Sequence, residues 1–418
     1  MVCAALALPA AAPAAAAGED PGAYAFAPGA RTVAGAPGTA GAPLLEPGRT
    51  YRSTVPRDGR LFYRLRLAAT DTAYVPVTAV PPAGAAVAAT DGVRVSLRDA
   101  HGASCSYSSA RFGAGLSARP VTALGQREAG KALCQGGGTY YLFVERLDAE
   151  GAPAGGWDLE IAPVTEPRPA RTGPTAAPDA WDSATPEPLA AAPRDRSGGT
   201  GFATARTVGQ GVWRTRLSPG ATRFYKVPLD WGRQLHASAE LGGSPGHGYV
   251  GGALNLSLYN PVRGHVDDAS LGYTGAPRPV ALQPLPPVEY ANRYAVPGGV
   301  TAVRFAGAYY LALHLSARTA EVFGRGPYEV TLRVRVGGRA HAGPGYAGRP
   351  VPADVFAVTA GDREEAAAGS AGDGGGLAMR LVAVGGIGGG TALLLVLLGW
   401  TVAARRAHTR LSAQKPTA

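Results

Sequence analysis

The chain has 418 residues, 60 glycines, 36 prolines and a formal net charge of +10. This length allows roughly two or three domains, and abundant Gly and Pro with few helical patterns favour β-rich modules joined by loose linkers. The basic excess consists of arginines that are scattered along the sequence rather than clustered with aromatic residues, so we exclude nucleic acid as a partner. The bias toward Arg and Ala is typical of a GC-rich coding sequence, such as that of an actinobacterium.

The N-terminal segment has the pattern of an export signal. Residues 1–17 are apolar and end in Ala15, Ala16 and Ala17, which fit a signal-peptidase site. The segment lacks the usual Lys or Arg near its start, which favours a true start codon further upstream. We expect residues 1–17 to be a signal peptide, so that the residues after it are exported.

Two stretches of the chain, residues 26–162 and 202–336, repeat the same sequence blocks in the same order. Such ordered matches indicate that one module has been duplicated. The matched blocks are 26–33 with 202–208, 51–67 with 213–229, 93–99 with 254–260, 138–144 with 307–313, and 156–161 with 326–332.

Most of these blocks alternate apolar and polar residues, which is the pattern of a strand with one buried face. In the first copy, Val93, Val95 and Leu97 alternate with Arg94 and Ser96. Strands of this kind form antiparallel sheets, and two such sheets packed face to face make a sandwich. We therefore expect an all-β fold of two tandem antiparallel β-sandwich domains, one for each copy.

The blocks also carry a recurring set of aromatic and glycine residues. A strand with Phe-Tyr is followed by a strand that ends near Asp or Asn, then by Gly-x-Tyr-Tyr-Leu and by a final Gly-x-aromatic strand. The residues are Phe62, Tyr63, Val95, Leu97, Asp99, Gly102, Gly138, Tyr140, Tyr141, Gly156, Trp157 and Leu159 in the first copy, and Phe224, Tyr225, Leu256, Leu258, Asn260, Gly264, Gly307, Tyr309, Tyr310, Gly326, Tyr328 and Val330 in the second.

This order resembles that of bacterial pre-peptidase C-terminal domains, which are jelly-roll-like β-sandwiches attached to secreted proteases and other exported proteins. The resemblance covers most of both copies and departs from the family at the inserts 242–252 and 277–297. It implies a jelly-roll-like fold and an exported setting, and it names no ligand.

Two cysteines, Cys105 and Cys134, follow the signal segment. Because exported proteins fold in an oxidising compartment, we expect a disulfide between them. A catalytic redox pair is the alternative, but it would require a close C-x-x-C spacing that is absent. A bridge that closes a loop of about 30 residues contributes roughly 3 kcal/mol in the chain-entropy model.

Two segments have the composition of linkers. Residues 163–201 and 337–380 are rich in Pro, Ala and Gly and contain few large apolar residues. Such segments bury little surface, so we expect a loose linker between the sandwiches and a stalk after the second one.

The sequence shows no catalytic constellation that we would defend, and it contains no H-E-x-x-H motif. His247 and His265 lie in a loop-rich insert near Asp267 and Asp268, where a weak metal site and a polar surface loop are alternatives; we favour the loop. In each Tyr-Tyr pair, alternation directs one ring into the core and the other to the surface. We favour this ordinary packing over the alternative, in which the two rings form a platform for binding sugars. We therefore predict no enzymatic activity, no metal and no cofactor.

Residues 381–404 form an uncharged apolar run, long enough for a helix across a hydrocarbon core of about 30 Å. The tail, residues 405–418, is basic, whereas acidic residues precede the run. By the positive-inside rule the tail is cytoplasmic and the bulk of the chain lies outside. We expect a single-pass protein of the cell membrane; a buried core helix is the alternative, which the basic tail disfavours.

Two pairs of small residues lie in the outer half of this run. Gly385 with Gly389, and Gly386 with Gly390, have the small-x-x-x-small spacing that lets two membrane helices approach closely. A homodimer through this helix is one hypothesis, and the general Ala and Gly bias of the chain is the alternative explanation.

These features together predict an exported, membrane-anchored protein that acts as a non-enzymatic binding or scaffolding module for another envelope protein. Binding of a cell-wall polymer or carbohydrate is the first alternative, and an accessory role for a secreted protease is the second. The sequence does not identify the partner.

Overall fold

The computed structural model describes residues 23–148, 155–171, 173–178, 180–187 and 189–371. The predicted signal peptide, the apolar run with Gly385, Gly386, Gly389 and Gly390, and the basic tail lie outside these residues. Among the residues that are described, no helix is long and apolar enough to cross a membrane.

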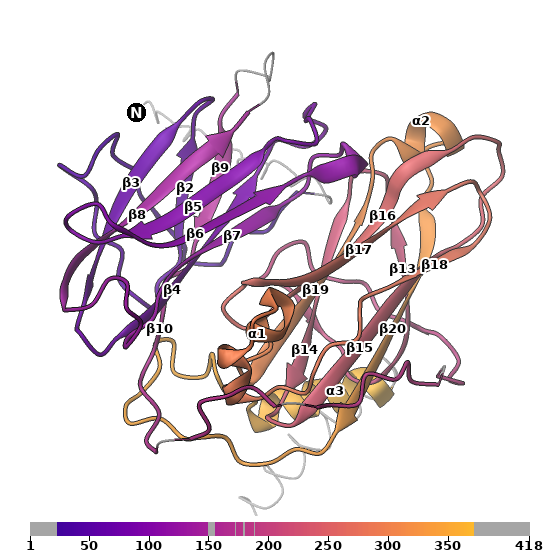
Figure 1. The fold of residues 1–418 in the computed structure, drawn as a ribbon. Helices are drawn as coiled ribbons and strands as arrows, with labels where there is room; N and C mark the ends of the chain where they lie inside the picture. Colours follow the sequence, from indigo (N-terminus) through magenta and orange to yellow (C-terminus); the bar gives the residue numbers. More distant parts are fainter. Residues whose placement is uncertain (1–22, 149–154, 172, 179, 188, 372–418) are drawn as a thin grey trace, which may run out of the picture.

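The first module consists of two β-sheets (Figure 1). One sheet has the strand order β1-β2-β9-β4-β10, with β7 paired to β4, and the other has the order β3-β8-β5-β6. The strands are β1 (Arg31–Thr32), β2 (Tyr51–Val55), β3 (Arg60–Leu67), β4 (Thr72–Val80), β5 (Gly92–Arg98), β6 (Ser104–Arg111), β7 (Val121–Arg127), β8 (Gly138–Leu147), β9 (Trp157–Ile161) and β10 (Val164–Glu166), with the 3₁₀ turn η1 (Gly113–Gly115) between β6 and β7.

The second module also consists of two sheets, with the orders β11-β13-β20-β15-β18 and β12-β14-β19-β16-β17. Its strands are β11 (Arg194–Asp195), β12 (Arg206–Thr207), β13 (Gly211–Leu217), β14 (Thr222–Leu229), β15 (Arg233–Leu241), β16 (Val250–Tyr259), β17 (His265–Tyr273), β18 (Arg278–Ala281), β19 (Gly307–Leu315) and β20 (Tyr328–Gly338). The helical elements are η2 (Tyr290–Tyr294), α1 (Gly298–Ala302), α2 (Thr319–Phe323) and α3 (Ala360–Ala371).

Alternation within the strands gives each module its own core. Tyr63 and Val95 are fully buried in the first module, and the matching Tyr225 and Leu256 are fully buried in the second. The predicted all-β fold of two sandwiches is thus confirmed. Most strand pairs are antiparallel, but the short strands β1, β11 and β12 add to their neighbours in parallel.

Strand registers confirm four of the five matched blocks and correct the first. Three pairs of opposite residues in the first module each have an equivalent in the second. Phe62–Phe143 corresponds to Phe224–Ala312, Leu97–Leu142 to Leu258–Leu311, and Val55–Trp157 to Leu217–Tyr328. In contrast, Arg31 of β1 pairs with Tyr51, and its structural counterpart is Arg194 of β11, which pairs with Trp213. The match of 26–33 with 202–208 fails because β12 joins the other sheet, on β14.

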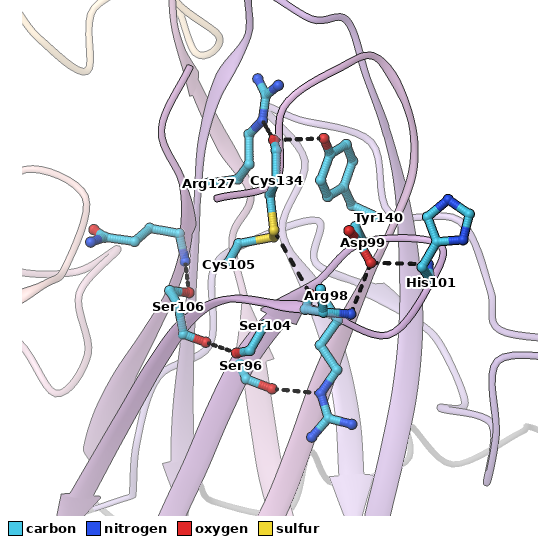
Figure 2. The surroundings of a disulfide bond; sticks show 12 residues. Ser96, Arg98, Asp99, His101, Ser104, Cys105, Ser106, Arg127, Cys134 and Tyr140 are labelled. Atoms are coloured by element: carbon cyan, nitrogen blue, oxygen red, sulfur yellow. Dashed lines mark hydrogen bonds between the residues drawn. A yellow bond between two sulfur atoms is a disulfide. The ribbon is translucent and has the colours of Figure 1, made fainter. Parts of the chain in front are cut away.

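The predicted disulfide is present (Figure 2). Cys105 of β6 is bonded to Cys134, in the loop before β8, with an S–S distance of 2.07 Å. Arg127 lies fully buried beside this loop; its Nε donates to the carbonyl oxygen of Cys134 at 3.0 Å and its Nη2 to that of Gly136 at 2.9 Å. The hydroxyl of Tyr140 donates to the Cys134 carbonyl as well, at 3.0 Å. These bonds and the disulfide tie the loop to β6 and β7.

Parts of the predicted linker and stalk are packed rather than loose, although most of the described residues from 167 to 193 are exposed. Residues 164–166 form β10, in which Val164 and Glu166 are buried. After the second module, Phe356 is buried and stacks on Phe305 with ring centroids 5.0 Å apart, and α3 is held by an ion pair between Arg363 and Asp230 at 2.7 Å. The expectation from composition was wrong for these parts because a few large or charged residues, such as Phe356 and Arg363, fix segments that otherwise consist of small residues.

Buried ion pairs join the two modules. Arg293 lies 2.8 Å from Glu166, and Arg304 lies 3.3 Å from Glu128. Arg263 pairs with Glu160, whose side chain is completely buried. An aromatic cluster surrounds two of these pairs; its buried members are Tyr74, Val164, Val262, Phe305 and Phe356. The two sandwiches therefore form one packed unit.

The first described residues reach across to the second module. The hydroxyl of Tyr24 donates to Glu160 at 3.1 Å, and the backbone N–H of Ala27 donates to the same carboxylate at 2.8 Å. The Tyr24 ring also packs edge-on against Phe224 of β14, with centroids 5.9 Å apart. This segment thus covers part of the outer face of the second module.

Candidate functional site

Aromatic and arginine side chains gather on the outer face of sheet β3-β8-β5-β6. One row of paired residues crosses the four strands: Phe62 lies opposite Phe143, Phe143 opposite Ser96, and Ser96 opposite Tyr107. Residues that are directly opposite in a sheet point to the same face. We name this surface the aromatic–arginine face; its residues are Phe62, Tyr107, Tyr141 and Phe143 with Arg60, Arg64, Arg66, Arg94 and Arg98.

The arginines of this face lie against its rings. The guanidinium of Arg98 lies over the Phe143 ring at 4.2 Å from the centroid, and that of Arg94 lies 5.5 Å from the centroid of Tyr107. The Phe62 and Phe143 centroids are 5.1 Å apart. Cation–π contacts of this kind hold flexible arginines close to the surface. Tyr107 remains 63% exposed and is free to contact a ligand.

The charge of the face is almost entirely positive. Its acidic residue, Glu145, lies 3.0 Å from Arg60 and 2.7 Å from Arg94. Within the described residues, Arg64, Arg66 and Arg98 lie within ion-pair distance of no carboxylate. A groove of about 510 Å³ runs over this part of the face, and its residues include Phe62, Ser96, Tyr107 and Phe143.

The equivalent face of the second module is covered. Phe224, the counterpart of Phe62, packs against Phe202 at 4.9 Å between centroids and against Tyr24. Tyr259, the counterpart of Arg98, is buried in the same cluster. The duplicated fold therefore offers this face to solvent in the first module and closes it in the second.

This site could be predicted from the sequence only in part. As expected, Tyr140 and Tyr309 are buried, whereas Tyr141 and Tyr310 are half-exposed. The arginines of the face, which are scattered in the sequence, come from the two strands β3 and β5, and the strand β8 that pairs with both brings them together. The usable signal was their alternation with core residues, as in residues 60–66 and 94–98.

The histidines and aspartates of the insert give no metal centre in the described residues, where no group of three or more His, Cys, Asp or Glu side chains is arranged to hold an ion. His265 Nε2 lies 3.1 Å from Asp268, and Asp267 accepts a hydrogen bond from the backbone N–H of Gln283 at 2.7 Å. These residues belong to β17 rather than to a loop, and His265 and Asp268 line a cleft between the modules.

The segment 242–246 matches the G-x-S-x-G pattern of many hydrolases. In those enzymes the serine sits on a sharp turn between a strand and a helix, beside a histidine. Here Ser244 follows β15 without a helix, and its Oγ accepts a hydrogen bond from Tyr273 at 2.9 Å. Within the described residues no histidine hydrogen-bonds to it, so this arrangement does not activate the serine.

No protein-family model matches the chain, and no curated protein shows significant sequence similarity to it. Among solved structures, the CUB1-EGF-CUB2 domain of human MASP-1/3 matches 68% of this chain and 99% of that chain, with 9% identity and a TM-score of 0.16. The N-terminal CBM22-1-CBM22-2 tandem domain from Paenibacillus barcinonensis Xyn10C matches 66% of this chain and 82% of that chain, with 16% identity and a TM-score of 0.19. Scores this low carry no argument about function, which must come from the residues themselves.

Proposed function

We propose that this protein is a non-enzymatic binding module of the cell surface, and that its aromatic–arginine face takes an anionic glycopolymer of the cell envelope. The observation that carries the proposal is the exposed ring of Tyr107 and the partly exposed ring of Phe62, with arginines on both sides; Phe143 is buried beneath Arg98 and supports this surface from below. Sugar rings have apolar C–H faces that pack on aromatic rings, while guanidinium groups pair with carboxylate or phosphate groups. A face that is positive along its length suits a polymer of repeated negative charges.

The setting of this function is inferred from sequence. We infer that residues 381–404 anchor the chain in the cell membrane with its N-terminus outside, and that the sandwiches are of the jelly-roll-like, pre-peptidase C-terminal type. Domains of that type are attached to exported proteins, which supports an extracellular setting. An envelope protein with an acidic surface is the second candidate partner, because exposed Tyr and Arg side chains such as Tyr107 and Arg98 are frequent at the energetic centres of protein interfaces.

A binding assay on the full-length chain in mild detergent tests the proposal. The probes are polygalacturonate, poly(glycerol phosphate) and neutral dextran, in buffers of increasing NaCl concentration. We expect both polyanions to bind, dextran to bind weakly or not at all, and affinity to fall as salt rises. Equal binding of dextran, or no binding of either polyanion, would overturn the proposal.

Variants of the face sharpen the test. Exposed ion pairs contribute up to about 1 kcal/mol each, so the double variant Arg94→Gln/Arg98→Gln should lose roughly 5- to 30-fold in polyanion affinity. Arg278→Gln/Arg325→Gln removes two exposed arginines of the second module and is the control matched in charge. If the control loses as much affinity as the double variant, binding depends on net charge rather than on this face. If an acidic protein from the envelope competes with the polymers and binds more tightly, the second candidate is favoured.

A further inference from the structure

A cleft lies between the two modules beside the aromatic–arginine face. Its volume is about 580 Å³, which is within the usual range for small-ligand sites. The first module contributes β6, η1 and Arg119, and the second contributes β16 and β17. We name it the inter-module cleft; the polar residues used below are Ser109, Arg119, Asn255, Ser257, His265 and Asp268.

The wall from the second module is built of hydrogen-bonding groups that are largely withdrawn from water. Asn255 and Ser257 lie on the outer face of β16, yet both are buried, and Ser257 Oγ donates to Asn255 Oδ1 at 2.7 Å. The hydrogen bond from His265 lowers the pKa of Asp268, so this carboxylate is ionised at neutral pH. Hydroxyl, amide and carboxylate groups arranged in this way suit the hydroxyl groups of a sugar.

The wall from the first module supplies a cation. The Nη1 of Arg119 donates to the carbonyl oxygen of Phe112 at 2.7 Å, and its Nη2 donates to that of Arg111 at 3.4 Å. Within the described residues no carboxylate lies within ion-pair distance of Arg119; Asp268 acts on it only from further away. Burial lowers the pKa of Arg119, but a guanidinium stays protonated in proteins. A partly desolvated cation whose two hydrogen bonds go to carbonyl oxygens, and whose charge no carboxylate of the described residues pairs with, is stabilised by an anionic ligand.

Strand β6 connects the cleft to the aromatic–arginine face. Tyr107 lines the groove on that face, and Ser109 and Arg111, which alternate to the same side of the strand, line the cleft. A chain that lies along the face can therefore continue over the edge of β6 into the cleft without crossing another element.

We propose that the inter-module cleft binds one acidic sugar unit, with the acidic group on Arg119 and the sugar hydroxyls on Asn255, Ser257 and Asp268. This inference rests on the proposed function, because the unit would belong to the polymer that the face takes. The face then supplies affinity for the polymer, and the cleft selects the acidic sugar.

Short probes separate the cleft from the face. Digalacturonate is too short to span both surfaces, and cellobiose is its neutral counterpart. With the full-length chain we expect digalacturonate to bind by calorimetry and cellobiose not to bind. Galactose 6-phosphate in a third titration shows whether phosphate replaces carboxylate on Arg119.

Two variants locate the binding. Arg119→Gln should weaken digalacturonate binding at least tenfold, because a charge-assisted hydrogen bond is lost. Ser109→Trp places a bulky ring at the exposed mouth without removing a contact inside, and it should block binding with the thermal unfolding midpoint unchanged. Tyr107→Ala, on the face, should leave digalacturonate binding intact while weakening polygalacturonate binding.

The outcomes distinguish the two proposals. If digalacturonate does not bind, or if Arg119→Gln and Ser109→Trp bind it as tightly as the wild type does, the cleft proposal is wrong. Polymer binding by the face is then judged separately, by its own assay. If digalacturonate binds and the variants of the face bind polygalacturonate as tightly as the wild type does, the cleft is a binding site and the face is not.

Discussion

The carboxylate of Glu166 offers a sharp test of how the modules are held together. Its side chain is 1% exposed and pairs with Arg293 of the second module at 2.8 Å. It also accepts hydrogen bonds from Tyr74 of β4 at 2.8 Å and from Tyr346 of the C-terminal segment at 3.1 Å. Burial raises the pKa of the Tyr74 and Tyr346 phenols, so both remain protonated donors at neutral pH.

Glu166→Ala should lower the free energy of unfolding by about 3–5 kcal/mol, because removal of one partner leaves the Arg293 cation buried and uncompensated. The double variant Glu166→Leu/Arg293→Met should recover most of this loss, since apolar replacement of a whole buried pair is often neutral. Chemical denaturation of the full-length chain in detergent gives the free energies. With the single variants Glu166→Leu and Arg293→Met measured as well, the double-mutant cycle gives the coupling.

The matched control is the exposed pair of Arg49 and Glu46, whose atoms are 2.6 Å apart with both side chains about half exposed. Glu46→Ala should cost no more than about 1 kcal/mol, because solvent screens this pair. A loss below about 1 kcal/mol for Glu166→Ala would refute the view that Glu166 clamps the two modules.

Three further predictions concern other parts of the chain. Replacement of Cys105 and Cys134 by serine removes a bridge between residues 29 apart and should cost roughly 3 kcal/mol of stability in the chain-entropy model, measured by denaturation against the oxidised wild type. Burial lowers the pKa of His314, which lies between Ser117 and Thr222, from 6.5 to about 3. The unfolded chain therefore binds the proton first, and stability should fall as pH drops from 6.5 toward 3 more steeply in the wild type than in His314→Gln; parallel pH profiles would contradict this. Gly385→Leu/Gly389→Leu should abolish self-association in a membrane reporter, and an unchanged signal would reject the helix-packing hypothesis.

The sequence predicted those features whose causes are local. Alternation such as Val93-Arg94-Val95 predicts a strand because neighbouring side chains point to opposite faces. The disulfide was predicted from two cysteines and the expectation of an oxidising compartment. The buried pairs of the interface were out of reach. Glu166 and Arg293 read as ordinary surface charges in the sequence, and only packing across 127 residues of chain makes them buried.

The aromatic–arginine face could be predicted from the sequence in part. Residues 60–66 and 94–98 each place arginine on the side opposite the core, so each strand alone predicts a basic edge. Which strands become neighbours, and whether another module covers them, is decided by topology. That is why Phe62 and Phe224 hold the same place in the repeat and meet different surroundings.

The N-terminal docking sets an order of events for a chain that emerges from its N-terminus. Tyr24 and Ala27 find their partners at Glu160 and Phe224, and Glu160 in turn needs Arg263. Domains generally fold in the order in which they are synthesised, so the first sandwich can collapse early. Residues 24–27, however, cannot take their final place until the second sandwich has emerged and folded. A fragment that ends within the segment joining the two sandwiches would therefore leave Tyr24 without its contact to Phe224 and Glu160 without its counter-ion Arg263.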